Sequence, residues 1–341
     1  MPKSPLSVLP ELLLPWFSQN ARDMPWRNTT DPYAIWVSEI MLQQTRVEAV
    51  RGYFTRFIDA LPHIQALAQV DEEKLLKLWE GLGYYNRAKN LKKAAQKIMQ
   101  DFHGVFPDNY EAIISLPGIG PYTAGAVSSI SFSLAYPAVD GNVLRVCSRF
   151  LEDSSCIDLA QTKRQVEKEI SALFSDTFHP GTFNQSIMEL GATVCLPNGK
   201  PLCDICPLSS HCKANIAGTQ LQFPVRAEKR KRKIEEKTIF VLSVEDEIAL
   251  LKSPDSGLLS GLWALPAVNG KLNEAMAIKQ IETWGLHPIQ LVKSRVEKHI
   301  FTHIEWQMVS YYVNCKVKGG TFTWGHSSHF ALPTAYRKFL D

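Results

Sequence analysis

One run in the middle of the chain, from Leu116 to Asp140, constrains the fold more than any other feature, and Asp140 is its only charged residue. It opens with the turn Leu-Pro-Gly-Ile-Gly, whose two glycines can adopt backbone conformations closed to other residues. Pro121 follows directly, and proline suits the first position of a helix because no partner is needed there for its missing N–H. The residues before the turn also have a helical pattern. The sequence therefore predicts two helices joined by a Gly-x-Gly turn, over about residues 110–132.

Such a turn presents backbone N–H groups, and the second helix adds the partial positive charge of its N-terminus. Gly118 and Gly120 make this exposure feasible, and the turn contains no lysine or arginine. A phosphate group bound through backbone N–H groups is the ligand that suits this turn. Such a contact would position a DNA duplex without reading its sequence. An ordinary helix connection with a glycine cap explains the same residues, so the turn alone leaves both interpretations open.

Asp140 ends the run and precedes Gly141, Asn142 and a further helical pattern. Aspartate in this place most commonly caps a helix, where the helix dipole favours its ionised form. An ionised carboxylate is also what a reaction through a cationic transition state requires. Asp140 is therefore either a plain cap or a catalytic group, and Asn142 is placed to orient it or a water molecule.

A second carboxylate, Glu39, lies in an apolar helical pattern that starts at Asp31. Ile35, Leu42 and Arg46 share its face of the helix at steps of three and four residues. A glutamate among apolar neighbours is either salt-bridged or functional. Burial would raise its pKa and keep a proton on it near neutral pH, which is the state that a general acid requires.

Two glycines end a helical pattern within the segment Gly-Leu-Gly-Tyr-Tyr, residues 81–85. Leu82 and Tyr84 would then project from a tight loop, where apolar and aromatic side chains can wedge between bases once one base has been flipped out. Leucine and tyrosine are also commonly buried, so a loop tucked into the core is the alternative.

Cysteine usage points to a metal centre. The count of seven in a chain without a signal peptide argues against a disulfide framework. Four fall in residues 195–212 with the spacing C-x7-C-x2-C-x5-C, namely Cys195, Cys203, Cys206 and Cys212. A structural zinc usually pairs two CxxC knuckles and only one is present, whereas four thiolates on a compact loop suit a [4Fe–4S] cluster. The ligand set alone does not choose between the two metals.

Length and composition favour two domains. A chain of 341 residues exceeds the usual size of one domain, and its formal net charge of +3 is compatible with nucleic-acid binding but weak evidence for it. The N-terminal sequence lacks the basic start, continuous apolar centre and cleavage site of a signal peptide. No stretch reaches transmembrane length, so we expect a cytoplasmic protein without membrane association.

The composition changes after residue 224. Residues 225–236 are rich in lysine and arginine and predict a solvated linker, with attraction to phosphate as an addition. Short strand patterns follow at 239–244, 248–251, 289–292 and 306–313, with helices at 273–284 and 334–340. We therefore divide the chain into an all-α domain of residues 1–224, the linker, and a smaller α+β domain of residues 237–341.

Together these motifs resemble the helix-hairpin-helix DNA glycosylases and, among them, the MutY-type adenine DNA glycosylases. The hairpin, the segment WVSEIMLQQT around Glu39, the GLGYY loop and the cysteine loop carry the resemblance, which covers essentially the whole chain. It implies a two-lobed catalytic domain with an iron–sulfur loop and a Nudix-like C-terminal domain, the first helix packing with residues 135–224. The cysteine spacing has one residue more in its first gap than the family pattern, which an irregular loop can absorb.

The resemblance also assigns catalytic roles. Glu39 would protonate the adenine, and Asp140 would stabilise the cation on the sugar, with Tyr122 and Asn142 holding it in place. Tyr122 stands where bifunctional relatives carry a lysine that forms a Schiff base with the sugar. The resemblance therefore implies a glycosylase without an efficient strand-cleaving step.

Further family positions imply contacts with DNA. Gln44 and Thr45 would probe the opposite base, and Leu82 and Tyr84 would insert beside the lesion. The adenine pocket would comprise Arg22, Trp26, Arg27, Gln185 and Met188, and the lesion-sensing loop would be Phe301, Thr302 and His303, with threonine in place of the family's serine. Without the resemblance, Trp26 is a core anchor, Gln185 a solvated helix residue and 301–303 a strand edge.

We therefore expect a monomeric enzyme of base excision repair in the bacterial nucleoid. It would hydrolyse the N-glycosidic bond of adenine opposite 8-oxoguanine or guanine in double-stranded DNA. The helix before Gly285 offers Glu282 as its one nearby carboxylate, too few for a catalytic magnesium, so the Nudix-like domain is expected to bind rather than hydrolyse. The alternatives are a related glycosylase for thymine mismatches or oxidised pyrimidines, and a non-catalytic DNA-binding module with a metal-stabilised hairpin.

Overall fold

The computed structural model describes residues 4–175, 178–228, 231–254 and 257–340. By their contacts the residues form two units, which fall in the ranges Met1–Val70 with Lys89–Glu228, and Asp71–Ala88 with Lys229–Asp341. Lys229 and Arg230 of the predicted linker lie outside the described residues. In the described part of the chain, no helix combines the length and the apolar composition needed to cross a bilayer.

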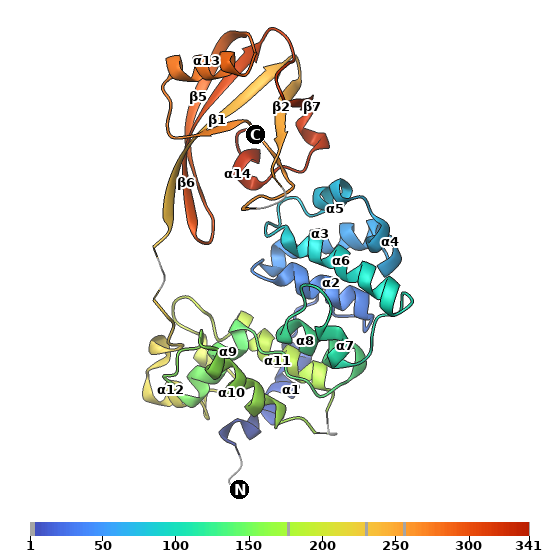
Figure 1. Ribbon diagram of the computed structural model, residues 1–341. Coiled ribbons are helices and arrows are strands. Elements are labelled where there is room, and N and C mark those ends of the chain that lie inside the picture. The colour runs from blue at the N-terminus through green and yellow to red at the C-terminus, as the bar shows by residue number, and fades with distance from the viewer. Residues whose placement is uncertain (1–3, 176–177, 229–230, 255–256, 341) are drawn as a thin grey trace. The chain divides into compact units, whose positions relative to one another are not determined.

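The first unit is helical (Figure 1). Its helices are α1 (Leu9–Asn20), α2 (Pro32–Leu42), α3 (Val47–Ala60), α4 (Ile64–Gln69), α6 (Asn86–Asp101), α7 (Tyr110–Ile114), α8 (Pro121–Phe132), α9 (Gly141–Leu151), α10 (Ala160–Ser171), α11 (Pro180–Thr193) and α12 (Lys213–Ala217). The first residues of α6, up to Ala88, fall in the second unit. The helices α7 and α8 confirm the predicted pair around the Gly-x-Gly turn.

The first helix packs on the lobe that carries the cysteine loop, as predicted. Leu9 and Leu13 of α1 are fully buried in one core with residues of α9, α10 and α11, among them Phe150 and Phe183. This core brings the N-terminal end of the chain against residues more than a hundred positions away. It also supports α9 and α11, the two helices that carry Asp140 at one end and Gln185 along one side.

The hairpin helix α8 is buried over most of its length. Residues 123–130 are all buried, and most of them are alanine, glycine or serine. The backbone that leads to Asp140 runs very close to this helix, because a Cβ added at Gly125 would lie 2.0 Å from the carbonyl oxygen of Pro137. The small side chains of α8 therefore set the distance between the hairpin and the segment that carries Asp140.

The second unit contains a mixed sheet together with helices. The strands are β1 (Lys233–Val244), β2 (Glu247–Lys252), β3 (Trp263–Ala264), β4 (Ala267–Asn269), β5 (Pro288–Ile300), β6 (Ile304–Cys315) and β7 (Thr323–Gly325), and the helices are α5 (Glu72–Leu78), α13 (Glu274–Thr283) and α14 (Thr334–Arg337). The strand order is β3-β2-β1-β6-β5, with β4 paired to β1 and β7 paired to β2. β1 runs parallel to β6, and β5 runs antiparallel to it.

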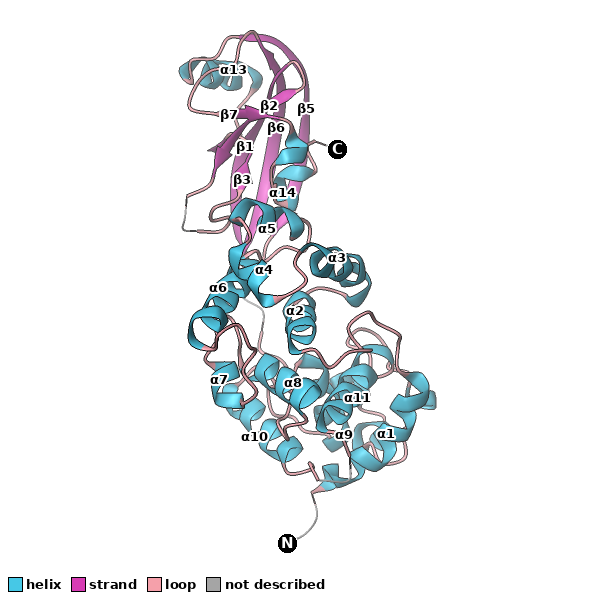
Figure 2. Ribbon diagram, turned by 90° about the vertical axis from the view of Figure 1, so that its right-hand side faces the viewer, coloured by secondary structure: helices cyan, strands magenta, loops and turns pink. Residues whose placement is uncertain are grey.

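The alternation of β1 explains why both faces of the sheet are covered. Ile239 and Val241 face a core that includes Leu332 and residues of α14. Phe240, with Leu242, faces a second core formed with α13. Since successive side chains of a strand point to opposite faces, a continuous apolar run predicts such a two-sided sheet. Figure 2 shows α13 and α14 beside the strands. β1 begins at Lys233, inside the segment predicted as linker, because it pairs there with Ile304.

We predict that Gly125→Ala destabilises the helical unit by roughly 1–3 kcal/mol, since the added methyl group would collide with the backbone at Pro137. Gly141→Ala, at the first position of α9, is the control, because nothing lies within 4 Å of its added Cβ. It should change stability by no more than about 0.5 kcal/mol. Urea unfolding followed by circular dichroism measures both, and equal midpoints for the two variants would contradict the close approach.

Candidate active site and metal centre

Glu39 lies inside the helical unit on α2, where residues 33–41 are all buried. Its side chain is only 6% exposed. Tyr122, one residue into α8, donates its hydroxyl to Glu39 Oε2 at 2.5 Å and also contacts Met188 Sδ at 3.3 Å. Three helices, α2, α8 and α11, therefore meet at the hydroxyl group of Tyr122. The resemblance implied that Tyr122 helps to hold Asp140 in place. In the structure its hydroxyl is instead hydrogen-bonded to Glu39.

Burial raises the pKa of Glu39 from 4.5 to about 7. The bond from Tyr122 acts in the opposite direction, and the negative charge of Asp140 adds to the rise. A carboxyl group with this pKa keeps its proton in a large share of molecules at neutral pH, so Glu39 can act as a general acid.

Asp140 caps the N-terminus of α9. Its Oδ1 accepts the backbone N–H groups of Asn142 and Val143, both at 2.9 Å, and its Oδ2 accepts Asn142 Nδ2 at 2.6 Å. The pKa of Asp140 is raised, because burial outweighs these three donors, which lower it by binding the ionised form. The side chain is thus both a helix cap and a carboxylate held in one orientation.

Arg145 connects this carboxylate to the cysteine loop, and the sequence reasoning missed it. Its Nη2 donates to Asn142 Oδ1 at 2.9 Å and to the carbonyl of Gly191 at 2.7 Å, and its Nε donates to the carbonyl of Cys195 at 2.8 Å. Accepting this bond fixes which end of the Asn142 amide faces Asp140. An arginine three residues after Asn142, and so one helical turn away on the same face of α9, was the available signal.

A buried ion cluster lies where the adenine pocket was predicted. Glu189 on α11 is 1% exposed and accepts bonds from Arg22 Nε at 2.7 Å and Nη2 at 3.0 Å. Arg27 Nη2 donates to the same carboxylate at 2.6 Å. Burial alone would raise the pKa of Glu189, but the two arginines outweigh it and lower the pKa. Glu189 also escaped prediction, although it follows Gln185 and Met188 on one helix.

The other predicted pocket residues surround this cluster in different ways. Trp26 is buried with its ring 5.3 Å from that of Phe54, so it is a core anchor whatever else it does. Gln185 and Met188 are half-buried on α11. Gln44 is exposed and Thr45 half-buried in the turn after α2. Gln44 has a φ of 57°, a left-handed conformation that is uncommon outside glycine and is found at functional turns.

The hairpin turn uses its two glycines differently. Gly118 has a φ of 79°, and an added Cβ would lie 2.6 Å from Asn90 Cβ. Gly120 has an extended backbone, caps α8 and has open space around it. The turn therefore needs glycine at residue 118 for conformation and packing, whereas residue 120 leaves room for an approaching group.

In the second unit, Phe301, Thr302 and His303 form the turn between β5 and β6. Phe301 packs on Trp306 with 4.9 Å between the ring centroids, while Thr302 and His303 are exposed. Thr302 Oγ1 lies 3.2 Å from the hydroxyl of Tyr84.

The loop of residues 81–85 presents one of its two predicted wedge residues. Tyr84 is 48% exposed, whereas Leu82 is 6% exposed. The left-handed glycines Gly81 and Gly83 fold the turn back, and the N–H of Leu82 bonds to the carbonyl of Trp79. In this structure, therefore, only the tyrosine projects.

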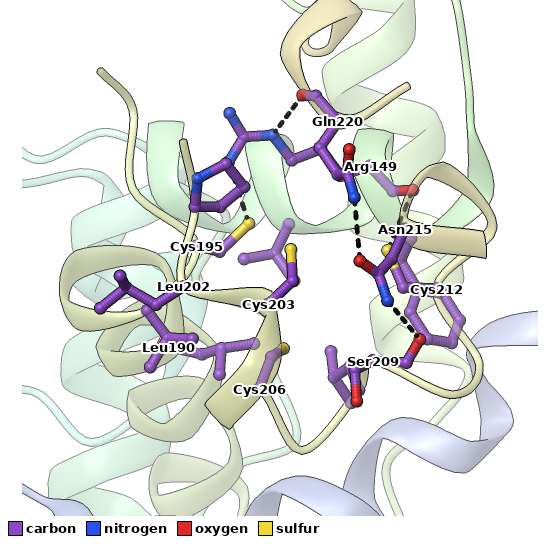
Figure 3. Close-up of a pocket in the computed structure, with 15 residues that line it drawn as sticks. Arg149, Leu190, Cys195, Leu202, Cys203, Cys206, Ser209, Cys212, Asn215 and Gln220 are labelled. Carbon is purple, nitrogen blue, oxygen red and sulfur yellow. Dashed lines mark hydrogen bonds between the residues drawn. The ribbon is translucent and has the colours of Figure 1, made fainter. Parts of the chain in front are cut away.

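The four cysteines of residues 195–212 line one pocket (Figure 3). Arg149 Nη1 donates to Cys195 Sγ at 3.3 Å, and the thiol of Cys212 donates to the carbonyl of Arg149 at 3.4 Å. Burial raises the pKa of the thiols of Cys203, Cys206 and Cys212, that of Cys206 to about 12. Among the described residues, no three such ligands converge on the position of a single metal ion.

Comparison with known proteins places the chain in a family. Residues 37–175 match the model of the HhH-GPD superfamily base excision DNA repair proteins, and residues 238–341 match the NUDIX domain. Adenine DNA glycosylase of Buchnera aphidicola subsp. Schizaphis graminum is 33% identical, with 98% of each chain covered. The chain belongs to the adenine DNA glycosylase family. This confirms the family, the enzyme class and the two-part fold that the motifs predicted.

Other relatives agree. The Buchnera aphidicola subsp. Acyrthosiphon pisum enzyme is 35% identical over 80% of this chain and 78% of its own length. The Arabidopsis thaliana enzyme is 35% identical over 91% of this chain, which spans 57% of that relative's length. Among solved structures, a thermostable thymine-DNA glycosylase is 28% identical with a TM-score of 0.57, covering 62% of this chain and 97% of that one. An endonuclease III–DNA complex, 22% identical with a TM-score of 0.53 over 62% of this chain and 95% of that one, shows the shared fold.

The raised pKa of Glu39 makes a prediction for stability. The folded state holds this proton up to about pH 7, while the unfolded state loses it near the ordinary pKa of 4.5. Wild-type stability should therefore lose up to about 3 kcal/mol as the pH rises through this window. Glu39→Gln cannot ionise and lacks this loss, so its stability relative to wild type should grow with pH. Urea unfolding of both proteins at about pH 5 and about pH 8 measures the difference. A difference that is the same at both pH values would show that Glu39 titrates normally.

Proposed function

We propose that this protein removes adenine paired with 8-oxoguanine or guanine from double-stranded DNA, as a step of base excision repair. The observation that carries the proposal is the buried pair of carboxyl groups with opposite environments. Glu39 sits among apolar side chains with a pKa of about 7, while Asp140 accepts three N–H groups at a helix N-terminus. An acid and an anion close enough for the charge of one to act on the other are what acid-assisted glycosidic cleavage needs. The relatives are named adenine DNA glycosylase, and on that ground we propose adenine as the base that is removed.

Cleavage begins once the adenine has left the base stack, because its reacting atoms are inaccessible inside the duplex. Tyr122 donates to Oε2 of Glu39, so the acidic proton is available from Oε1. Transfer of this proton to N7 of adenine lets the base leave as a neutral molecule with both electrons of the C1′–N9 bond. The deoxyribose is left with a positive charge at C1′.

Asp140 faces this cation as an ionised carboxylate. Asn142 and the backbone of α9 hold both of its oxygens, and Arg145 holds Asn142. Because these groups are in place before the reaction, they need no rearrangement as charge develops. A water molecule then adds its oxygen to C1′, and the proton that it releases restores the acid. Tyr122 offers no amine for a Schiff base, so the reaction ends at an abasic site with the strand intact.

Two sets of residues would contact the lesion and the base opposite the adenine. Gln44 and Thr45 follow α2 in the helical unit, and Thr302 lies at the tip of the β5–β6 turn in the other. A hydroxyl can donate and accept, so Thr302 can meet either edge group of an oxidised purine. The backbone N–H groups of the hairpin turn at Gly118 and Gly120 would bind DNA phosphates.

A panel of duplexes tests this function directly. Adenine opposite 8-oxoguanine should be released fastest, then adenine opposite guanine, and adenine opposite thymine should stay intact. Glu39→Gln should lose at least about 100-fold in single-turnover rate and keep its affinity for the duplex, because only the acid is removed. The wild-type rate should also fall above about pH 7, where Glu39 loses its proton.

A second candidate, a glycosylase for thymine mismatches, is favoured by the likeness to the thymine-DNA glycosylase structure. The same panel includes thymine opposite guanine for this reason. Release of thymine without release of adenine would replace the proposal. Normal adenine release by Glu39→Gln would remove Glu39 from the mechanism while leaving the substrate assignment intact.

We also propose that Cys195, Cys203, Cys206 and Cys212 hold a [4Fe–4S] cluster. All four line one pocket, and four thiolates on one compact loop with a single CxxC pair suit such a cluster. The cluster would supply no bond-breaking chemistry. Four thiolates would complete its coordination, so it would order the loop of residues 195–212 for docking on DNA.

Cys203→Ser should lose iron and acid-labile sulfide together with the visible absorbance, and the helical unit should unfold at lower urea because metal binding contributes to folding. Cys156→Ser is the matched control, since Cys156 does not line the pocket. It should retain the wild-type iron content. Stoichiometric zinc in a colourless wild-type protein would contradict the cluster.

A further inference from the structure

The backbone of the 81–85 loop is held in an unfavourable conformation. Gly81 and Gly83 have φ values of 101° and 69°, and Tyr84 has a φ of 47°. Glycine adopts the left-handed region freely, but a tyrosine does so at a cost in free energy that its surroundings must offset. Tyr84 is also the exposed member of the loop, so the strained residue is the one that the loop presents.

Arg87 supplies the interactions that hold this conformation. Its Nη2 donates to the carbonyl oxygens of Leu82 and Gly83, both at 3.0 Å, and its own N–H donates to the carbonyl of Tyr84 at 2.9 Å. Trp79 Nε1 adds a bond to the carbonyl of Gly83 at 3.1 Å. Three consecutive carbonyl groups of the turn are thus oriented by two side chains and one helix start.

The guanidinium also lies against the aromatic rings. The Cζ of Arg87 is 5.3 Å from the ring centroid of Trp79 and 5.6 Å from that of Tyr84. Arginine stacks on aromatic faces because its planar cation is weakly hydrated and is attracted to the ring quadrupole. Arg87 is itself buried and remains charged, with a pKa lowered by burial to about 10.

At its outer end Tyr84 has a second contact, the 3.2 Å approach of its hydroxyl to Thr302 Oγ1. The ring is therefore held at its base by Arg87 and at its tip by the β5–β6 turn, and both contacts lie within one unit. A side chain held at both ends loses little conformational entropy when it inserts between bases, so holding it in advance strengthens binding.

We propose that Arg87 is a positioning residue for recognition of the mispair, acting through Tyr84. It touches the turn and the ring of Tyr84 and contributes to DNA binding only by fixing where that ring projects. This inference rests on the proposed function and deepens it, because it names the residue that sets the geometry of the wedge.

A double-mutant cycle tests it. Arg87→Lys keeps the charge but loses the planar fork, and Tyr84→Ala removes the wedge. Affinity is measured for a duplex with 8-oxoguanine opposite an adenosine whose sugar is fluorinated to prevent cleavage, and for the same duplex fully matched. Arg87→Lys should weaken binding to the mispair about fivefold, or about 1 kcal/mol, and leave the matched duplex unchanged. In the Tyr84→Ala background Arg87→Lys should have no further effect.

Two controls separate this role from simpler ones. Lys93→Gln removes one exposed positive charge from the same helix, α6, and should weaken binding to both duplexes alike. Trp79→Phe removes the other donor to the carbonyl of Gly83 and should reproduce the selective loss at smaller size, even where Arg87→Lys fails to fold.

Equal losses for Arg87→Lys with and without Tyr84 would overturn the proposal, as would equal losses on mispaired and matched DNA. These results differ from failure of the proposed function, which would appear as a wild-type protein that releases no adenine. If the wild-type protein releases adenine but the effects of Arg87→Lys and Tyr84→Ala are additive, the role of Arg87 is rejected and the proposed function stands.

Discussion

The hydrogen bond from Tyr122 to Glu39 is the contact on which the proposed site depends. It joins α8 to α2 at a carboxyl group that water hardly reaches, and the same hydroxyl touches Met188 on α11. Most of the buried residues of α8 are alanine, glycine or serine, and the backbone at Pro137 leaves no room for a Cβ at Gly125. That backbone leads directly to Asp140. The close approach of α8 to the backbone at Pro137 thus helps to place both carboxyl groups. A methyl group added at Gly125 would push these two segments apart.

Much of this could be predicted because the signals are local. A proline after two glycines, an aspartate before a helix and four closely spaced cysteines each act on residues a few positions away, and the structure has a hairpin, a cap and a pocket there. Glu189 and Arg145 were missed because their partners are distant in sequence. Arg22 meets Glu189 across 167 residues, and Arg145 reaches Cys195 across 50. No periodicity within one helix reveals such a pair.

The assignment of residues 71–88 to the second unit could not be predicted from the sequence either. By its contacts this segment belongs to the unit that contains the sheet, although the chain enters and leaves it from helices of the other unit. Glu80 accepts the N–H of Leu332 at 3.0 Å, and Lys77 donates to the carbonyl of Phe330 at 3.0 Å. These bonds attach α5 and the turn that follows it to residues more than 250 positions later. The loop that presents Tyr84 is therefore built on the same unit as the turn of Thr302, which hydropathy along the chain could not show.

The two carboxyl groups also show why residue type alone does not assign an acid and a base. Glutamate and aspartate have similar ordinary pKa values, and the helix dipole alone would predict an ionised Asp140. Burial acts on both groups in the same direction. They are distinguished by their donors, since Glu39 receives one hydroxyl whereas Asp140 receives three N–H groups, one of them from an amide held by Arg145. Donors that bind the ionised form favour charge on Asp140, and their scarcity at Glu39 leaves the proton there. The proposed roles of acid and anion therefore rest on the number of donors that reach each group, which only the folded chain determines.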